Sequence, residues 1–419
     1  MSQTGRHEAN GQPKNAEQAE DSEQLGRVEQ TASAEQAASV EQAGSAKGPD
    51  SAEQSGSVQG LADSDRPASA EEAARTEGQQ QPGFLTELWD AISVRTVTLV
   101  VGVLVLQLGF ILSYVGAFHS PTPHRIPVSV VAPAQVAPQL IGQLNGIPGN
   151  PLHAVAVTDQ AAARSLIARG SSAGALLVNP AGKTDTLLVA SAGGTSTSGA
   201  LEQVITAAET SQQRSATVQD VVGLQAGDGR GLTGFYLVIG WIVGGYLVAS
   251  LLGVAKGARP ATVRRAVIRL LAVIPYAIVS GLGGAVIVGP VLGALTGHLM
   301  ALWWLGALLV FAAASVTMAF QVLFGVLGIG VTVLVFVVLG NPSAGGAYQA
   351  SLLPPFWRAI SSALPNGAGT DSVRRIVYFQ GHGIGGHLIL ITVYAILGAA
   401  VAIVASGLRQ HRATGQPVT

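Results

Sequence analysis

The feature that most constrains this chain is a set of six long apolar segments. Each approaches the roughly twenty residues that a helix needs to cross the hydrocarbon core of a bilayer, and ionisable side chains are absent from their interiors. A segment surrounded by lipid must satisfy its own backbone hydrogen bonds, so we expect helices. The expected spans lie near 94–115, 232–254, 270–292, 299–319, 322–340 and 387–406. The sequence therefore predicts an α-helical polytopic membrane protein with about six transmembrane helices.

Composition agrees with this class and excludes several others. Charged residues make up 11% of the chain, against about 25% in an average soluble domain. A net charge of −1 provides no field to attract nucleic acid, and the lack of cysteine excludes disulfides and thiolate chemistry. The pair His382 and His387 matches no standard metal-ligand spacing, and no catalytic motif is present. We expect no enzymatic activity, no cofactor and no bound metal.

The two ends of the chain are predicted to lie outside the folded part. Residues 1–82 repeat Glu-Gln pairs among Ser, Ala and Gly, which cannot bury enough apolar surface to offset the entropy of ordering. We interpret them as a disordered, low-complexity cytoplasmic tail. Residues 83–115 combine an amphipathic interfacial helix with the first span, and residues 409–419 form a short cytoplasmic tail.

Residues 116–230 separate the first span from the second and alternate strand-like and helix-like patterns. The expected strands lie near 126–131, 152–157, 173–178 and 186–190, and the expected helices near 136–144, 159–169 and 198–216. This predicts one α/β domain. The segment Asn179–Thr184 resembles the end of a phosphate-binding loop, but a strand follows it where that motif requires a helix. We interpret it as a hairpin turn.

Basic residues predict the orientation of the chain. Arg259, Arg264, Arg265 and Arg269 form the densest cluster of positive charge, in the loop after the second span. The positive-inside rule places this loop and both termini in the cytoplasm, and the α/β domain outside a cell membrane. Two interpretations of the loop stay open, an anchor on membrane lipid phosphates or a docking element for a cytoplasmic partner.

Residues 231–408 are expected to form a five-span membrane domain. Small residues recur at every fourth position in its second helix, a pattern that lets another helix approach closely. This predicted helix-packing seam consists of Gly281, Ala285, Gly289, Gly293 and Gly297. Outside the membrane, residues 352–365 predict an interfacial helix, started by prolines and carrying Phe356, Trp357 and Ile360 on one face.

Several short motifs carry a resemblance to a known family. They are Ile126–Pro133, Gly174–Val178, Asn341–Gly346, Leu353–Trp357 and Leu364–Gly367. With one span before an outer domain and five after it, the chain resembles the type-2 ABC transporter permeases, in their phage-infection-protein-like branch. The resemblance implies a permease subunit that forms a homo- or heterodimer. It also implies separate cytoplasmic ATPase subunits, docked at the basic loop and at the helix before the first span.

Two functions remain open. The resemblance favours the permease subunit of an ABC-type exporter, moving an apolar or amphipathic substrate with ATP hydrolysed by a separate subunit. Ion-driven transport is disfavoured because such transporters usually hold an ionisable residue near the bilayer midplane. The alternative is a non-transporting membrane scaffold or surface receptor, whose outer domain binds an envelope component or phage. Association with an ATPase would favour the first, and binding confined to the outer domain the second.

Overall fold

The computed structural model describes residues 94–260 and 262–414, which belong to one compact unit, residues 83–419. The predicted tail 1–82 and the predicted interfacial helix before the first span lie outside the described residues. At the other end, the last helix continues to Thr414, so residues 409–414 of the predicted tail are helical.

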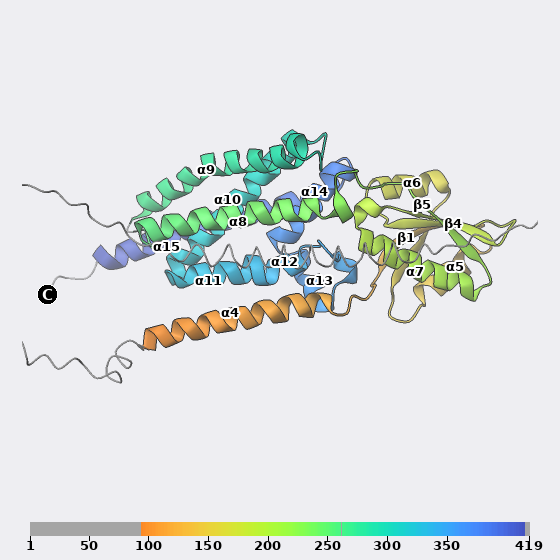
Figure 1. The fold of residues 1–419 in the computed structure, drawn as a ribbon, viewed down its shortest axis with the longest axis horizontal. Helices are drawn as coiled ribbons and strands as arrows, with labels where there is room; N and C mark the ends of the chain where they lie inside the picture. Colours follow the sequence, from red (N-terminus) through yellow and green to blue (C-terminus); the bar gives the residue numbers. More distant parts are fainter. Residues whose placement is uncertain (1–93, 261, 415–419) are drawn as a thin grey trace, which may run out of the picture. The chain divides into compact units, whose positions relative to one another are not determined.

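Five helices in the described part of the chain are long and apolar enough to cross a membrane. They are α4 (Val94–Phe118), α8 (Thr233–Lys256), α9 (Val263–Val286), α10 (Leu299–Phe324) and α15 (Gly385–Thr414). The protein is mostly helical, and these five helices are consistent with a polytopic membrane protein (Figure 1).

The fourth and fifth expected spans, 299–319 and 322–340, are divided a few residues later in the structure than predicted. Helix α10 continues through Gln321, which is buried, and ends at Gly325, whose φ of 68° only glycine adopts readily. The apolar stretch that follows, Leu327–Ser343, is 17 residues long and is shorter than each of the five long helices. It comprises α11 (Leu327–Val333), the π-helical turn η5 (Leu334–Leu339) and α12 (Gly340–Ser343).

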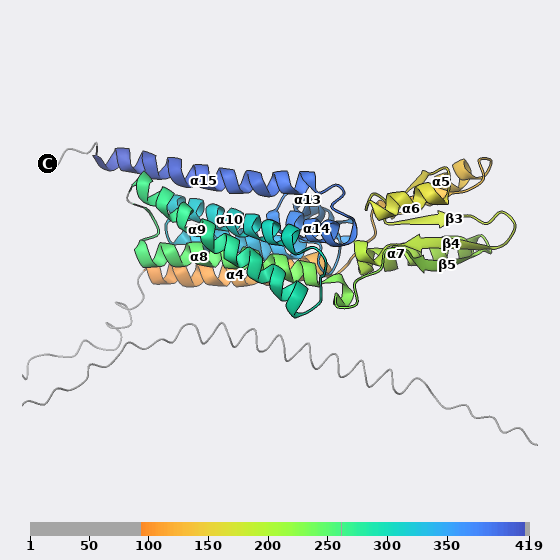
Figure 2. The ribbon, with the colours of Figure 1, turned by 90° about the horizontal axis from the view of Figure 1, so that it is seen from above.

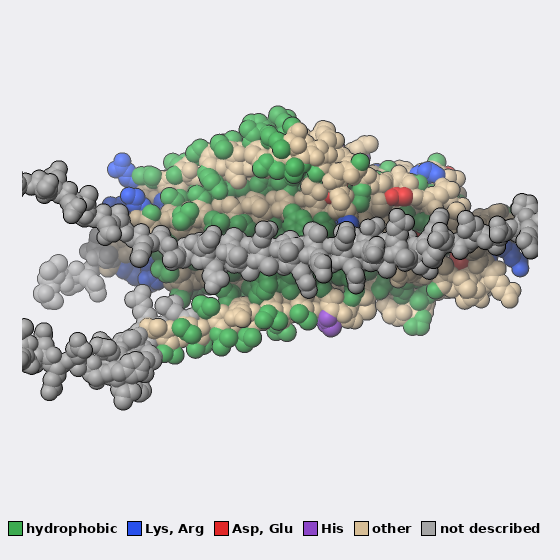
Figure 3. Space-filling model, viewed as in Figure 1, with side chains coloured by type: hydrophobic (Ala, Val, Ile, Leu, Met, Phe, Trp, Pro, Cys, Tyr) green, Lys and Arg blue, Asp and Glu red, His purple; other side chains and the backbone are tan. Residues whose placement is uncertain are grey.

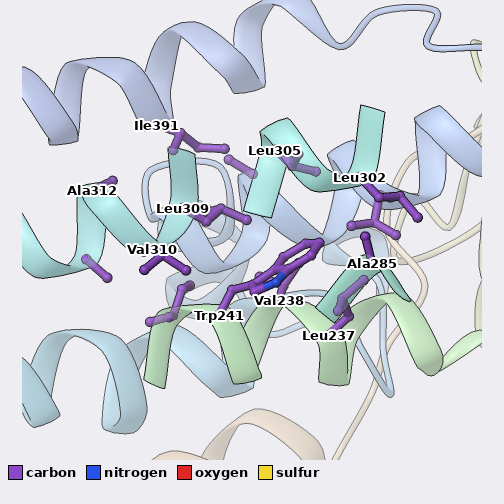
Figure 4. Close-up of a cluster of buried hydrophobic side chains, with 14 of the residues drawn as sticks. Leu237, Val238, Trp241, Ala285, Leu302, Leu305, Leu309, Val310, Ala312 and Ile391 are labelled. Carbon is purple, nitrogen blue, oxygen red and sulfur yellow. The ribbon is translucent and has the colours of Figure 1, made fainter. Parts of the chain in front are cut away.

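Helix α10 forms the centre of the helical region and packs against α8, α9 and α15. Most of its side chains are buried, and 72% of its most apolar window is buried, against 6% for α4. Met300, Trp304 and Phe324 near its two ends are exposed. Figure 4 shows Leu302, Leu305 and Leu309 of α10 meeting Val238 and Trp241 of α8. Helix α4, in contrast, contacts mainly η5 and α12.

The strands form one five-stranded sheet in the order β2-β1-β3-β4-β5. They are β1 (Ile126–Val131), β2 (Leu152–Ala156), β3 (Gly174–Leu177), β4 (Thr184–Val189) and β5 (Ser215–Asp220). All neighbouring strands are parallel except β3 and β4, which form an antiparallel hairpin (Figure 2). The predicted turn lies between these two strands, with Asn179 to Lys183 in the turn and Thr184 as the first residue of β4.

Three helices cover this sheet, and strand alternation decides which side chains meet which helix. On one face, Leu176 and Leu187 pack with α5 (Ala137–Asn145) and α7 (Thr195–Ser211). On the other face, Ala175 and Leu188 pack with α6 (Gln160–Ala168), whose N-terminus is capped by Asp159. We refer to residues 126–220 as the sheet region.

Strand β5 was not predicted from the sequence. The segment 198–216 was expected to be one helix, but α7 ends at Ser211 and β5 begins four residues later. Gln213, with a φ of 57°, reverses the chain between them. β5 lies at the edge of the sheet and is only half covered, so its apolar alternation is weak. Tertiary pairing with β4 therefore determines this strand.

The predicted interfacial helix is shorter than expected and is followed by a second helix. Helix α13 covers Pro355–Ser361, and Pro365 begins the new helix α14 (Pro365–Tyr378), because proline fits the first turn of a helix. Short turns complete the described fold: η2 (Ser191–Gly193), η3 (Gly229–Gly231), the π turn η4 (Ile287–Val291) and η6 (Ala350–Leu352).

Candidate functional site

Basic side chains gather at the end of the helical region where α8 ends and α9 begins, which we call the basic end. Arg259, Arg264 and Arg265 are exposed there, and Arg269 is half-buried. Thr262 starts α9 by accepting a hydrogen bond from the backbone N–H of Arg265 at 3.3 Å. This cap places three arginines on the first two turns of α9.

Hydrogen bonds tie four helix termini together at the basic end. The Arg269 guanidinium donates to the Lys256 carbonyl at the end of α8 (2.8 Å), and Arg409 of α15 donates to the Leu323 carbonyl at the end of α10 (3.0 Å). The backbone N–H of Val263 donates to the Gln410 side chain at 3.2 Å. Arg264, Arg265 and Arg269 thus belong to helix α9, whereas Arg259 lies in the loop between α8 and α9.

No acidic side chain is placed at the basic end among the described residues. The acidic residues between 94 and 414 lie elsewhere, in the sheet region, its linker to α8, and α14: Asp159, Asp185, Glu202, Glu209, Asp220, Asp228 and Asp371. Figure 3 shows blue side chains without red ones at this end, on the left, whereas both colours occur in the other half of that face. Within the described part of the chain, no carboxylate therefore balances the positive charge of the basic end.

Only part of the predicted glycine seam lies in a helix contact. A Cβ on Gly281 would come within 2.5 Å of the backbone nitrogen of Ala307, so α9 and α10 touch there through backbone. Ala285 is fully buried beside this contact. Gly289 lies in the π turn η4, while Gly293 and Gly297 follow the helix with φ values of 64° and 87°. The seam therefore ends at about Ala285.

The predicted face of the outer interfacial helix is divided in the structure. Trp357 is buried against Ala117 and Leu353, and Ile360 packs beside this cluster. Phe356 points the other way and is 57% exposed, with its ring at 81° to that of Trp357. Consecutive residues are about 100° apart around a helix axis, so Trp357 of α13 faces the protein while Phe356 lies at the exposed border of that face.

At the opposite end, α14 carries a cluster of paired charges. Asp371 accepts from Arg374 (3.3 Å), Arg375 (3.0 Å) and His387 of α15 (2.9 Å). Burial alone would raise the pKa of Asp371, but the His387 hydrogen bond and the two arginine charges hold it well below its usual range. No partner was predicted for Asp371, although Arg374 and Arg375 follow it at the i, i+3 and i, i+4 spacing that favours ion pairs on a helix.

A second group of contacts joins α14 to the linker that precedes α8. The Tyr378 hydroxyl donates to Asp228 at 2.6 Å, and the other Asp228 oxygen accepts from the backbone N–H of Thr233 at 2.9 Å. Burial and this carboxylate raise the pKa of Tyr378, so the hydroxyl keeps its proton. Gln225 extends the group to the α9–α10 loop by accepting from the Thr296 N–H at 2.8 Å.

Gln349 links the helical region to the sheet region directly. Its side-chain carbonyl accepts from the backbone N–H of Thr197 (3.2 Å) and from the Thr197 hydroxyl (2.9 Å). Helix α7 begins at Gly194, which offers no side-chain cap, so Gln349 caps α7 from 152 residues away. Ser196 adds a bond to the Ala347 carbonyl at 2.7 Å.

These contacts border a hollow of about 110 Å³ between the sheet region and α14. Ser172, Thr197 and Ser198 line it from the sheet region, and Arg374 and Arg375 line it from α14. Each of these side chains already has a hydrogen-bond partner within the protein. The hollow is a polar seam and not a formed ligand site.

No group of three or more His, Asp or Glu side chains that could hold a metal ion occurs among the described residues. The loop Asn179–Thr184 uses its polar groups internally: the Asn179 side chain accepts from the Ala181 N–H, and Asp185 accepts from the Asn179 N–H. The hairpin geometry leaves no helix N-terminus after Thr184 on which a phosphate could sit.

No family model, no curated protein and no solved structure matches this chain. Function therefore has to be argued from the residues themselves. Sequence reasoning located the basic end but missed Gln349, Asp228 and Tyr378, whose partners lie about 150 residues away in the chain. No local sequence signal could have identified the contacts of these residues.

Proposed function

We propose that this chain is the membrane permease subunit of an ABC-type exporter, which moves an apolar or amphipathic substrate with ATP hydrolysed by a separate subunit. The observation that carries the proposal is the basic end, where four helix termini are tied together and no described carboxylate balances the arginines. A rigid positive surface suits the docking of an acidic partner, because charge complementarity favours the encounter and fixes its register.

In this proposal the chain lies in a cell membrane with the basic end and both termini in the cytoplasm. The helices α4, α8, α9, α10 and α15, together with the segment Leu327–Ser343, make six crossings. The sheet region then faces the outside. The permease works as a homo- or heterodimer, and lipid contacts cover the remaining apolar surface.

The long-range hydrogen bonds of Gln349, Asp228 and Tyr378, which in this proposal lie at the outer end, support a mechanical role for the chain. Gln349, just before η6, binds Thr197 of α7, and Asp228 in the linker before α8 binds Tyr378 of α14. A rearrangement of the helices driven from the basic end would therefore reach the sheet region through defined contacts. No buried carboxylate is found in the five long helices, which agrees with an energy source supplied by another subunit.

The alternative function is a non-transporting scaffold or surface receptor. One observation favours it: an open hollow of about 470 Å³ lies on the sheet region between α5 and α7, lined by Leu144, Ile147, Val204 and Ala208. Such a surface could bind an envelope component or a phage protein. The two functions differ in which end of the molecule binds a partner.

The test is purification of the native complex in mild detergent, followed by identification of co-purifying chains and an ATP hydrolysis assay. We expect an ATPase in the complex, and we expect the double substitution Arg264→Glu and Arg265→Glu to reduce its recovery at least tenfold, since a reversed charge costs several kcal/mol at an interface. The matched control is Arg164→Glu with Arg169→Glu, the same charge change on exposed positions of α6.

Recovery of the ATPase with the α6 control but not with the α9 variant would support the permease. A chain that purifies without any ATPase, or an ATPase retained equally by both variants, would contradict it. In that case binding assays on the full chain with substitutions in the α5–α7 hollow would test the receptor.

A further inference from the structure

The interior of the sheet region contains two carboxyl groups that share one cation. Asp185 of β4 is 1% exposed and Glu209 of α7 is 2% exposed. Arg214, in the turn between α7 and β5, donates to both oxygens of Asp185, with its Nε 2.9 Å from Oδ2. The same Nε also forms a long ion pair with Glu209, 3.5 Å from its Oε2.

The Glu209 oxygen that faces Arg214 accepts no hydrogen bond. This Oε2 is buried and has only the long ion pair with Arg214, and the backbone N–H of Asn179 donates to Asp185 and not to Glu209. If both carboxyls were ionised, the site would bury two negative charges against one positive charge. An uncompensated buried charge is costly, and a carboxyl in that position gains a proton to avoid the cost.

We propose that Asp185 and Glu209 form a proton-binding site that controls the closure of the turn between α7 and β5. With one proton on Glu209, the two carboxyl groups hydrogen-bond to each other and Arg214 balances the remaining charge. When the proton leaves, the like charges repel and the turn opens. This inference concerns the sheet region alone and does not depend on the proposed transport function.

The electrostatics of the site agree with this geometry. Burial, followed by the hydrogen bond and the charge of Asp185, raises the pKa of Glu209 to about 7, while Arg214 opposes the shift. Burial would also raise the pKa of Asp185, but its bonds to Arg214 and Asn179 outweigh that effect and lower it. These are the charged groups that meet Glu209 from β4 and from the turn, and on α7 itself Glu202 is exposed.

Glu209 also anchors the turn through its backbone. Its carbonyl accepts from the N–H groups of Gln212 (3.0 Å) and Arg214 (2.9 Å), immediately around the left-handed residue Gln213. The last turn of α7 forms one wall of the 470 Å³ hollow through Ala208, Ser211 and Gln212. Opening of the turn would therefore change both the edge strand β5 and the shape of that hollow.

The sign of the pH effect follows from linkage. The native state binds a proton on Glu209 up to about pH 7, whereas an open state that exposes Glu209 would release it near the ordinary value of 4.5. Between these limits the open state holds fewer protons than the native state. Raising the pH therefore favours opening by up to about tenfold per pH unit, and the effect levels off above about pH 7.

The experiment is hydrogen exchange measured by mass spectrometry on the full chain in lipid nanodiscs, from pH 5 to pH 8. After correction for intrinsic exchange rates, we expect protection of peptides covering 205–220 to fall by tenfold or more between pH 5 and pH 7. Glu209→Gln keeps the shape of the protonated acid and should give protection that is high and independent of pH. The control Glu202→Gln should behave as the wild type.

A second variant keeps the inference testable if Glu209→Gln folds poorly. Asp185→Asn removes the like charge, so Glu209 can ionise beside Arg214 and the pH dependence above pH 5 should disappear. A flat profile in the wild-type chain would overturn the proposal. So would a pH dependence that survives in either of the two variants at the pair.

Discussion

Two ends of the described structure carry several arginines in opposite settings. One is the basic end, and the other, which we call the paired end, carries the ion pairs of Asp371 on α14. At the paired end, Arg374 and Arg375 lie on Asp371, and their side chains are 11% and 23% exposed. At the basic end, Arg259, Arg264 and Arg265 are exposed and no described carboxylate lies among them. The paired arginines hold elements of the protein together, whereas the exposed arginines leave their charge available to another molecule.

This difference has a physical consequence for substitutions. Removing one member of a largely buried ion pair leaves an uncompensated charge and is expensive, whereas removing an exposed charge changes stability by less than about 1 kcal/mol. The same type of change, a charge replaced by an amide, should therefore give different results at the two ends. The following predictions test this contrast, beginning with the largest expected effect.

Asp371→Asn should give the largest loss of stability. The amide cannot accept equally from Arg374, Arg375 and His387, and it leaves the two arginines as neighbouring unbalanced charges on α14. Since the Asp371 side chain is 33% exposed, we expect a loss of about 2 kcal/mol in the free energy of unfolding, below the value for a fully buried pair. Equilibrium unfolding in mixed micelles, followed by tryptophan fluorescence, measures it.

The pH dependence provides an independent check on the same residue. Because the pKa of Asp371 is lowered in the folded state, its contribution is present above its ordinary value of 3.8 and is lost as the pH falls through the lower folded value. Asp371→Asn should remove this part of the acid sensitivity, and Glu202→Gln, at an exposed position of α7, should not. Equal stability of Asp371→Asn and the wild type would mean that the paired end does not depend on its charges.

Several parts of this architecture could be predicted from sequence because they depend on local periodicity. The long apolar helices and the first four strands follow from hydrophobic runs and alternation, and the helix expected near 159–169 is α6, capped by Asp159. The edge strand β5 was missed because its partner strand β4 determines it. The end of the seam was placed too far along, because small residues at 293 and 297 serve a left-handed backbone and not helix packing.

The contacts at the paired end show where prediction from local sequence patterns succeeds and where it fails. Asp371 and its arginines are one helical turn apart and were within reach of a local rule. Gln349 and Thr197, or Asp228 and Tyr378, come together only because segments about 150 residues apart in the chain fold against each other. The basic end was predictable as a cluster of charge, but the bonds from Arg269 and Arg409 that tie its helix ends were not.

Gln349→Leu should produce the next largest effect, again at the paired end. Leucine removes the acceptor for the Thr197 N–H and hydroxyl, so α7 loses its cap. Loss of a helix cap costs about 1 kcal/mol. We expect hydrogen exchange in the first turn of α7 to become about fivefold faster. Gln203→Leu, an exposed position on the same helix, is the matched control and should leave that turn protected. Unchanged exchange in the Gln349 variant would contradict the proposed cap.

Arg409→Gln should give the smallest effect, because it removes a charge at the basic end. The variant loses a bond of 3.0 Å to the Leu323 carbonyl, but Arg409 also lies near the like charges of Arg259 and Arg412, and removing it relieves their repulsion. The two contributions oppose each other, so we expect the free energy of unfolding to change by less than about 0.5 kcal/mol. The same micelle assay used for Asp371→Asn measures it, with Arg412→Gln as a comparison. A loss near 2 kcal/mol would mean that the basic end stabilises the fold as the paired end does, and its arginines would then be less available to a partner.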